Sequence, residues 1–282
     1  MPTKLRPAAL ALIAILMTAS GPLTASPAAA QDCRTTCTDY GPPQALGQGT
    51  ARTYVRVEHS RPVEIGAVVD AAALASLPYS PPTDEQHCVG TMCVGGYGLS
   101  LLLPPHAPTP YRWVLLNWNP AGHGPKGVFD VPHFDMHFYV TPRGTATAIR
   151  PGSCALLVAC DQVAKIAKPL DQRYVPPGYP TTLPATAQVA MGEHLETHDG
   201  FQNGATFIYG AIGGRLAFLE PMVRLDALQN SAPGDDRRRC LPVAQPQAWQ
   251  KAGWYPSEYC LGRSSAGDAE VSLDKLTFHD AG

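Results

Sequence analysis

Hydrophobic and polar residues alternate along much of this chain with a period of two residues. Such runs predict β-strands, because successive side chains of a strand point to opposite faces. The clearest runs lie at residues 53–58, 63–69, 98–103, 113–118, 133–141, 205–212 and 215–219. Gly213-Gly214 separates the last two runs, and this dipeptide predicts a tight hairpin. Short helices are expected at residues 71–77, 161–168 and 223–228, and residues 145–149 are expected to be a hairpin partner of the 133–141 strand.

The composition favours the same fold class. The chain has 29 Pro and 26 Gly, and only 16% of its residues are charged. Long amphipathic helices need charged faces and few prolines, so strands and turns are favoured. With 45% hydrophobic residues in 282, the chain can bury a substantial core. We therefore expect a mainly β fold, a sandwich or barrel-like single domain with few short helices.

The first thirty residues have the order of a secretory signal peptide. Lys4 and Arg6 come first, residues 8–17 are apolar, and small residues end in Ala28-Ala29-Ala30. The apolar stretch is shorter than the about 20 residues that cross a bilayer, which favours cleavage over a membrane anchor. We expect a signal peptide at 1–30, a flexible arm at 31–50, a β-rich domain at 51–263 and a peripheral tail at 264–282. The location would be secreted or periplasmic.

Charge argues against some partners. Cleavage would remove two cations and no anions, taking the net charge from −2 to −4. Nucleic-acid and anionic-membrane surfaces need clustered positive charge, so neither partner is expected. The one basic run, residues 237–239, follows two aspartates and is expected to be a solvated loop. A homo-oligomer and an unidentified small-molecule substrate stay open.

All eight cysteines follow the expected cleavage site. An even number in an exported chain predicts disulfides, and close pairs favour local bonds. The simplest pairing is 33–37, 88–93, 154–160 and 240–260. The alternative is a zinc cluster built from Cys88 and Cys93 or from Cys154 and Cys160, although thiols seldom stay reduced outside the cytoplasm.

The strand at 133–141 carries the strongest chemical signal. His133, Asp135 and His137 share one face, and the residues between them are apolar. Two histidines four residues apart on a strand are about 13 Å apart, so a single metal ion suits one histidine plus Asp135 better than both histidines. His194 is a further expected ligand from a distant segment. His123 and Glu220 are expected as supplementary ligands or as acid–base catalysts.

These residues predict a pocket for a divalent ion, because mixed histidine and carboxylate ligands suit Zn²⁺, Mn²⁺ or Fe²⁺. If the protein is an enzyme, metal-assisted catalysis with Glu220 or His123 as acid or base is expected. The same strand is also compatible with a structural hydrogen-bond network in a non-catalytic module that self-associates or binds a partner. A barrel-type binder of a small ligand, with an aromatic pocket, is a third option.

Three ordered blocks resemble the signature of an exported bacterial family of unknown function. They are residues 122–139 with Pro132-His133-Phe134-Asp135, residues 191–194 (Met-Gly-Glu-His), and residues 209–222, which end in Phe218-Leu219-Glu220-Pro221-Met222. The resemblance covers roughly residues 95–230. Gly124 stands where the family has an acidic residue, and Leu195 where an aromatic one is common. The resemblance implies a β-rich, self-associating single domain and no established reaction.

Overall fold

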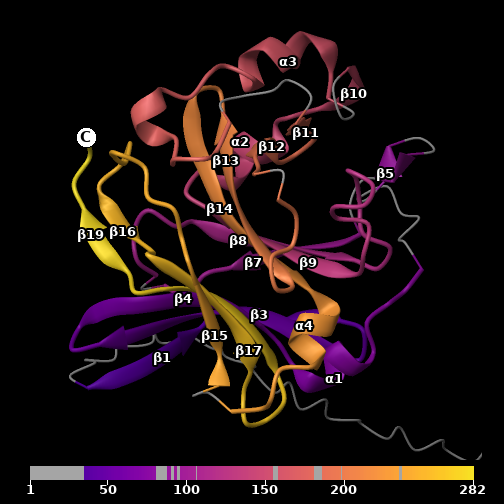
Figure 1. Ribbon diagram of the computed structural model, residues 1–282, viewed down its shortest axis with the longest axis vertical. Coiled ribbons are helices and arrows are strands. Elements are labelled where there is room, and N and C mark those ends of the chain that lie inside the picture. The colour runs from indigo at the N-terminus through magenta and orange to yellow at the C-terminus, as the bar shows by residue number, and fades with distance from the viewer. Residues whose placement is uncertain are drawn as a thin grey trace, which may run out of the picture. The chain divides into compact units, whose positions relative to one another are not determined.

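Two seven-stranded antiparallel sheets make up most of the fold (Figure 1). The computed structural model describes residues 35–80, 88–89, 92–93, 96–105, 107–154, 158–180, 186–197, 199–234 and 237–282. The segment with the features of a signal peptide therefore lies outside the described residues. All the described residues belong to one compact unit.

Sheet I contains strands from the N-terminal and C-terminal parts of the chain. Its order is β1 (Thr36–Tyr40), β3 (Gly49–Glu58), β4 (Arg61–Val69), β18 (Ala269–Asp274), β17 (Glu258–Arg263) and β15 (Arg239–Pro242), with β2 (Gln44–Leu46) paired to β3. Every pair is antiparallel, so short turns join several neighbours.

Sheet II contains the central part of the chain and every residue of the predicted site except His123. Its order is β11 (Ala187–Gln188), β12 (Gly192–Leu195), β13 (Ala205–Ile212), β14 (Arg215–Arg224), β9 (His133–Tyr139), β8 (Trp113–Asn119) and β7 (Tyr97–Leu102). The hairpin predicted across Gly213-Gly214 is confirmed, and both glycines have the positive φ that such a turn requires.

The remaining elements are short. Two small sheets pair β5 (Cys88–Val89) with β6 (Met92–Cys93) and β16 (Gly253–Tyr255) with β19 (Thr277–His279). The helices are α1 (Ala71–Ala75), α2 (Arg143–Thr147), α3 (Cys160–Ile166), α4 (Leu225–Gln229) and the 3-10 turn η1 (Gln172–Tyr174), and β10 (Pro151–Cys154) precedes α3. The expected mainly β fold with few short helices is confirmed. No helix among the described residues has the length and apolarity that crossing a membrane requires.

The two sheets enclose the main hydrophobic core. Ile65 and Val271 of sheet I belong to the same buried cluster as Leu116 and Phe134 of sheet II. At one side the sheets are joined directly, because the Thr53 hydroxyl donates to the carbonyl of Leu102, 2.6 Å away. The result is a half-barrel arrangement that leaves the outer face of sheet II to be covered by loops and α-helices.

Both ends of the described chain depart from the expected boundaries. Part of the expected flexible arm forms β1, which pairs with β3 from Thr36↔Glu58 to Tyr40↔Tyr54 and so covers an edge that would otherwise be unpaired. The expected peripheral tail contains β18, which lies between β4 and β17 in the middle of sheet I. Its inward residues Val271 and Leu273 are fully buried.

One local prediction is wrong. The expected hairpin partner at 145–149 contains most of helix α2, and the strand that pairs with the far edge of β9 is β14. The non-local pairing of β9 with β14 buries both edges of β9, which a short local hairpin would not achieve.

The described cysteines follow the predicted local pairing. Cys154 bonds to Cys160 and Cys240 to Cys260, and Cys37 is also disulfide-bonded. Cys88 lies opposite Cys93 in the β5–β6 register, while Cys33 lies outside the described residues. Because Cys154 and Cys160 are bonded to each other, they do not form the alternative zinc cluster.

Arg238 of the basic run is not in a solvated loop. Its guanidinium lies 2.5 Å from Glu64 Oε1 and 3.1 Å from Asp274 Oδ2 on the outer face of sheet I. The Arg238 side chain is 12% exposed and the Glu64 side chain 3%. The tyrosine hydroxyl of Tyr54 also donates to Glu64. Arginine is therefore required here as the partner of a buried carboxylate.

A pair of shortened chains tests the position of β18. We expect a chain that ends after Arg263 to lose cooperative unfolding, because it lacks a central strand of sheet I. A chain that ends after Leu276 lacks only β19 and should keep a cooperative transition at a lower temperature. Circular dichroism during heating measures both. A cooperative transition in the shorter chain would contradict the central role of β18.

A second prediction concerns the buried ion pair. Arg238→Gln should lower the free energy of unfolding by about 3 kcal/mol, because it leaves the Glu64 carboxylate without its main partner. The matched control is Arg239→Gln, an exposed neighbour, which should change the free energy by about 0.5 kcal/mol or less. Urea unfolding measures both, and equal effects would show that Arg238 has no special role.

Candidate functional site

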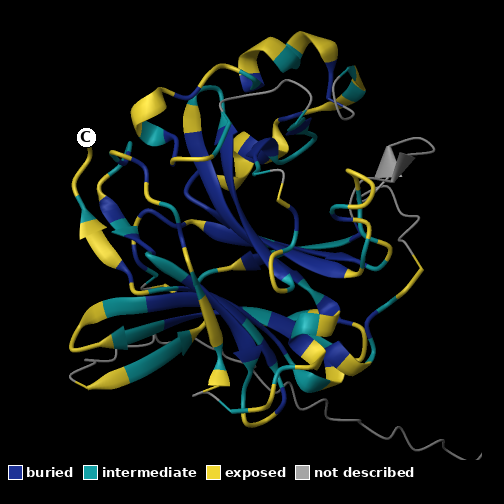
Figure 2. Ribbon diagram, viewed as in Figure 1, coloured by how far each residue is buried: buried dark blue, intermediate teal, exposed yellow. Residues whose placement is uncertain are grey.

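Strand β9 is buried on both faces, as the dark blue of sheet II in Figure 2 shows. Phe134, Met136 and Phe138 point into the main core between the sheets. His133, Asp135 and His137 therefore point to the opposite face, as the alternation predicted. Their exposed fractions are 0%, 6% and 1%, so this face is covered and does not meet bulk water.

Aromatic side chains cover this outer face. The Phe201 ring lies 5.2 Å from the His133 ring and 5.3 Å from the Phe129 ring, measured between centroids. Further along β9, the Phe218 ring lies 4.8 Å from the His137 ring. These rings exclude water from the polar side chains of β9 and lower the local polarity.

The structure divides the six predicted site residues into two clusters. The outer cluster is His123, His133 and Asp135, and the inner cluster is His137, His194 and Glu220. Within each cluster one donor atom from each residue lies within 4.8 Å of the others, close enough for one metal ion. Each cluster therefore has two histidines and one carboxylate.

The outer cluster converges on the carboxylate of Asp135. His133 Nε2 lies 3.0 Å from Asp135 Oδ1, and His123 Nε2 lies 3.4 Å from Asp135 Oδ2. The side chain of His123 is 33% exposed, whereas that of His133 is fully buried. This cluster therefore meets solvent on the His123 side.

The loop between β8 and β9 positions His123. Gly122 has a φ of +70°, and an added Cβ there would lie 2.3 Å from the carbonyl oxygen of Phe129. The amide of His123 donates to that same carbonyl, which closes the loop. Only glycine fits this turn, and the turn brings the His123 ring to 4.7 Å from the His133 ring.

Asn119, which the sequence analysis did not single out, completes the outer cluster. Its amide nitrogen donates to Asp135 Oδ2 at 2.7 Å and lies 3.3 Å from His133 Nε2. Its side-chain oxygen accepts from the amide of Gly96, which fixes the orientation of the side chain. Asn119 ends strand β8 directly opposite His133, so its polar character at the end of an apolar strand was the available signal.

The inner cluster draws on three strands. His137 of β9 points its Nε2 at Glu220 Oε1, 3.3 Å away, and His194 of β12 points its Nε2 at Glu220 Oε2, 3.7 Å away. The three side chains are 1%, 7% and 2% exposed. Among the described residues, His137 Nε2 and Glu220 Oε2 have no hydrogen-bond partner.

Gly210 allows His194 to reach this cluster across β13. In the sheet register Gly210 lies between His194 and Phe218. A Cβ at position 210 would lie 2.1 Å from the Phe218 ring, so only glycine leaves room for that ring. The His194 and Phe218 rings are then 5.1 Å apart, over a strand position that has no side chain.

The ring orientation of all four histidines is set by the backbone. The Nδ1 atoms of His123 and His133 lie 2.8 Å and 2.6 Å from the carbonyl oxygens of Gly124 and Val131. Those of His137 and His194 lie 3.3 Å from the carbonyl oxygens of Leu115 and Thr186. A carbonyl only accepts, so each Nδ1 carries the hydrogen, and in the neutral ring each Nε2 presents its lone pair to a carboxylate.

The nitrogen–oxygen separations can be compared with those of a hydrogen bond and of a metal-ligand set. Ordinary N–H···O bonds are 2.7–3.2 Å long. Two ligands bound tetrahedrally at 2.0–2.2 Å are about 3.4 Å apart. Of the four separations, 3.0, 3.4, 3.3 and 3.7 Å, the first lies in the usual hydrogen-bond range and the other three are longer, in the range of weak hydrogen bonds or of metal ligands. The donor atoms of each cluster therefore lie close enough together to hold a metal ion.

The protonation states of the outer cluster reflect its ionised carboxylate. Burial opposes a charge on His123, but the hydrogen bond and the charge of Asp135 raise the pKa of His123 to about 9. Burial likewise opposes ionisation of Asp135, yet the His133 and His123 rings hold the pKa of that carboxyl well below its usual range. In the metal-free protein at neutral pH, Asp135 is therefore an anion and His123 carries a proton.

In the inner cluster the pKa values shift in the opposite directions, because its side chains are more deeply buried. Burial lowers the pKa of His137 to about 4 and, together with the charge of His137, that of His194 to about 3. Burial and the negative charge of Asp135 raise the pKa of Glu220 well above its usual range. At neutral pH both imidazoles are therefore neutral, with free Nε2 lone pairs.

Each predicted site residue thus has a place in the structure. The four expected metal ligands His133, Asp135, His137 and His194 do not form one shell, because they divide between the two clusters. His123 and Glu220, expected as supplementary ligands or acid–base groups, each complete one cluster. The neighbouring His198 lies outside the described residues.

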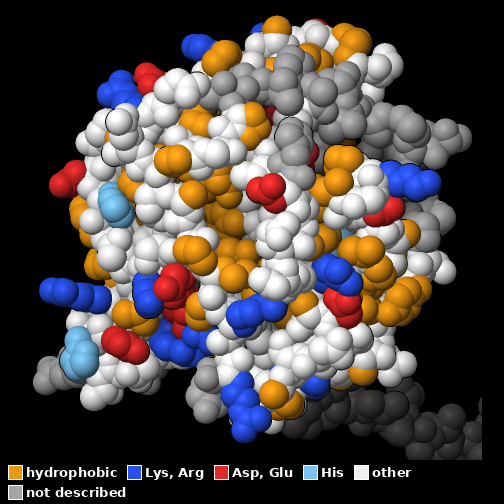
Figure 3. Space-filling view, viewed as in Figure 1, with side chains coloured by type: hydrophobic (Ala, Val, Ile, Leu, Met, Phe, Trp, Pro, Cys, Tyr) orange, Lys and Arg blue, Asp and Glu red, His pale blue; other side chains and the backbone are white. Residues whose placement is uncertain are grey.

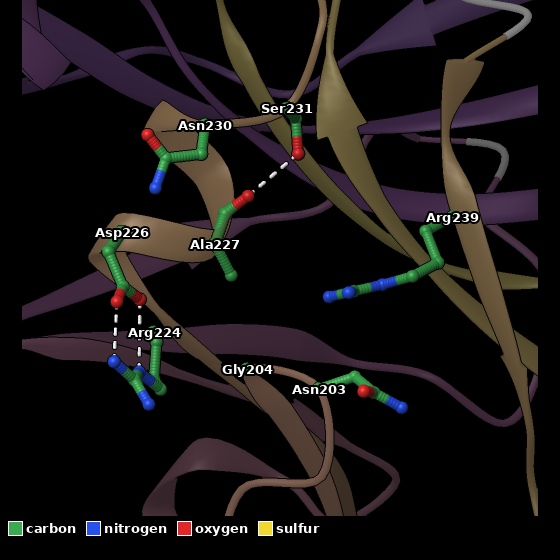
Figure 4. Close-up of a pocket in the computed structure, with 8 residues that line it drawn as sticks. All are labelled: Asn203, Gly204, Arg224, Asp226, Ala227, Asn230, Ser231 and Arg239. Carbon is green, nitrogen blue, oxygen red and sulfur yellow. Dashed lines mark hydrogen bonds and ion pairs between the residues drawn. The ribbon is translucent and has the colours of Figure 1, made fainter.

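A separate open pocket contains none of these residues (Figure 4). Its volume is about 430 Å³, and it is lined by Asn203, Gly204, Arg224, Asp226, Ala227, Asn230, Ser231 and Arg239. Arg224 and Asp226 are paired with each other through two hydrogen bonds. This pocket has no buried titratable group, so the chemistry of the protein is better sought at the clusters.

The face of the molecule drawn in Figure 3 has no large patch of a single charge. Lys and Arg side chains there are interspersed with Asp and Glu side chains.

Comparisons of the chain with protein-family models, with curated proteins and with solved structures found no match. The resemblance of the three sequence blocks to an exported family therefore stays a prediction.

A titration tests the electrostatics of the outer cluster. In metal-free protein we expect Asp135→Asn to lower the pKa of His123 from about 9, because the hydrogen bond and the charge of Asp135 that oppose the burial penalty are lost, and only the smaller contributions of the Gly124 carbonyl and of Glu196 remain. Nuclear magnetic resonance of the imidazole protons measures this shift. The control is Asp130→Asn, an exposed carboxylate of the same loop, which should leave His123 unchanged.

The same coupling predicts a pH dependence of stability. The pKa of His123 is higher in the folded than in the unfolded protein, so its contribution is complete below about pH 6.5 and is lost as the pH rises through about 9. Thermal unfolding of metal-free protein should show this loss, and Asp135→Asn should abolish it. An unchanged profile in that variant would contradict the assignment.

Proposed function

We propose that this chain is an exported protein that binds a divalent metal ion through the outer cluster. His123 Nε2, His133 Nε2 and a carboxylate oxygen of Asp135 would be the ligands. The supporting observation is that the Nε2 atoms of two imidazoles, oriented by contacts of their Nδ1 atoms with backbone carbonyls, converge on one carboxylate. Two histidines and one carboxylate form a common ligand set for catalytic Zn²⁺ and for non-haem Fe²⁺.

The outer cluster suits an ion with open coordination positions. It supplies three protein ligands, and fewer than the four of a closed tetrahedral site leave a position for a further molecule. The partly exposed His123 gives access from solvent, while Asn119 holds Asp135 from the buried side. A bound divalent ion supplies Lewis acidity, which metal-dependent enzymes use to polarise a substrate or to activate a water molecule.

Export is supported by the cysteines and by the N-terminal sequence. The described disulfides are typical of proteins in an oxidising compartment. The basic, apolar and small-residue order of the first thirty residues is that of a signal peptide. Both features favour a secreted or periplasmic protein.

A second candidate function is a non-catalytic exported module in which the clusters are structural networks. One observation favours it: His133 Nε2 and Asp135 Oδ1 are 3.0 Å apart, an ordinary hydrogen-bond length. In that case hydrogen bonds would join the histidine rings to the carboxyl groups, and the module would act by self-association or by binding a partner.

Zinc binding distinguishes the two functions. We expect Zn²⁺ at a hundred times its dissociation constant to stabilise the protein by about 2.7 kcal/mol. His133→Gln and Asp135→Asn should each weaken binding at this cluster by more than about 100-fold, the upper end of the loss seen for groups that only support a ligand. Isothermal titration calorimetry measures the affinity, and urea unfolding with and without chelator measures the stabilisation.

The matched control for this experiment is His279→Gln, a histidine of β19 that belongs to neither cluster. This variant should bind Zn²⁺ like the parent protein. Protein that is purified without metal, does not bind Zn²⁺ and is equally stable with chelator would contradict metal binding and favour the structural module.

A further inference from the structure

The inner cluster lies one strand step from the outer cluster. His137 follows Asp135 by two residues on the same face of β9, a Cα separation of about 6.6 Å. The two clusters use different residues throughout, and their carboxylates come from different strands, β9 and β14. A single ion cannot serve both, because His133 and His137 are about 13 Å apart along the strand.

The inner cluster offers four donor atoms from three side chains. Each histidine faces a different oxygen of Glu220, with separations of 3.3 Å and 3.7 Å. Both separations exceed the usual limit of a hydrogen bond and lie on either side of the about 3.4 Å that separates two tetrahedral ligands. Two of these four atoms, His137 Nε2 and Glu220 Oε2, are buried and have no hydrogen-bond partner among the described residues.

The Glu220 carboxyl group also has no lysine or arginine beside it among the described residues. Its only ion-pair contacts among those residues are the two histidine rings. A carboxylate that is 1% exposed requires a cation or a proton in its immediate surroundings. Lone pairs from two imidazoles at the same carboxylate favour a metal cation.

We propose that His137, His194 and Glu220 form a second divalent-metal site, so that the protein holds two ions on one face of sheet II. This inference rests on the proposed function of the outer cluster as a metal site. Glu220 supplies one or both carboxylate oxygens and each histidine supplies one nitrogen, which are the same donor types as in the outer cluster. The second ion binds β9, β12 and β14 together.

The two ions differ in their access to solvent. The ligands of the inner site are at most 7% exposed, and the Phe218 ring packs against both histidines at 4.8 Å and 5.1 Å. In the outer site His123 is 33% exposed. The inner ion therefore exchanges slowly and the outer ion rapidly.

Zinc stoichiometry and release test this division. Protein saturated with Zn²⁺ and dialysed is analysed for metal content, and release is followed with an excess of a coloured chelator. We expect about two ions per chain and two phases of release. Asp135→Asn should retain one ion and lose the fast phase, whereas Glu220→Gln should retain one ion and lose the slow phase. His194→Gln, from another strand, should match Glu220→Gln, and His279→Gln should match the parent protein.

Each other outcome overturns a specific claim. One ion per chain that is lost in Asp135→Asn and unchanged in Glu220→Gln and His194→Gln would remove the second site and leave the proposed function intact. Loss of all metal in each single variant that remains folded by circular dichroism would indicate one shared site. Two ions retained in both Glu220→Gln and His194→Gln would place the second ion elsewhere, and no bound metal in the parent protein would refute both proposals.

Discussion

A strand that is buried on both faces must provide a partner for every polar group it carries. All seven residues of β9 are buried, and three of them are two histidines and an aspartate. Water cannot solvate these side chains, so their charges and lone pairs must be satisfied by protein groups, protons or metal ions. The arrangement of the surrounding loop, β12 and β14 follows from this requirement, because they bring the groups that meet the polar face of β9.

The protein contains two different solutions to the burial of a carboxylate. On sheet I, Glu64 is compensated by Arg238 and Arg56 and by the hydroxyl of Tyr54. On sheet II, Asp135 and Glu220 are surrounded by imidazole rings instead. An arginine is always charged and fills its site permanently, whereas a neutral imidazole leaves a lone pair for an ion that can bind and leave. The first solution is suited to stability and the second to metal binding.

The two clusters also show how sheet geometry separates ligands that are near one another in the sequence. His133 and His137 share a face but meet different neighbours, because each strand position of β9 faces a different part of the sheet and its covering loops. His194 of β12 reaches the inner cluster only because Gly210, the residue of β13 beside it, has no side chain. Glycine at one strand position therefore determines which histidine reaches which carboxylate.

Much of this protein was determined by the sequence alone. The two-residue alternation identified β3, β4, β8, β9 and the β13–β14 hairpin, and it placed the polar side chains of β9 on one face, since a strand has only two faces. Local cysteine pairing was equally accessible at Cys154–Cys160 and Cys240–Cys260, because short loops bring these residues together.

Only the tertiary structure decided which segments pair and which ligands meet. The place of β18 in the middle of sheet I, the partner of Arg238 and the division of six residues into two clusters all depend on contacts between distant segments. Alternation determines which face a side chain occupies, but it contains no information on what lies across that face. That is set by non-local strand order, and strand order is chosen by the burial of the whole core rather than by any local pattern.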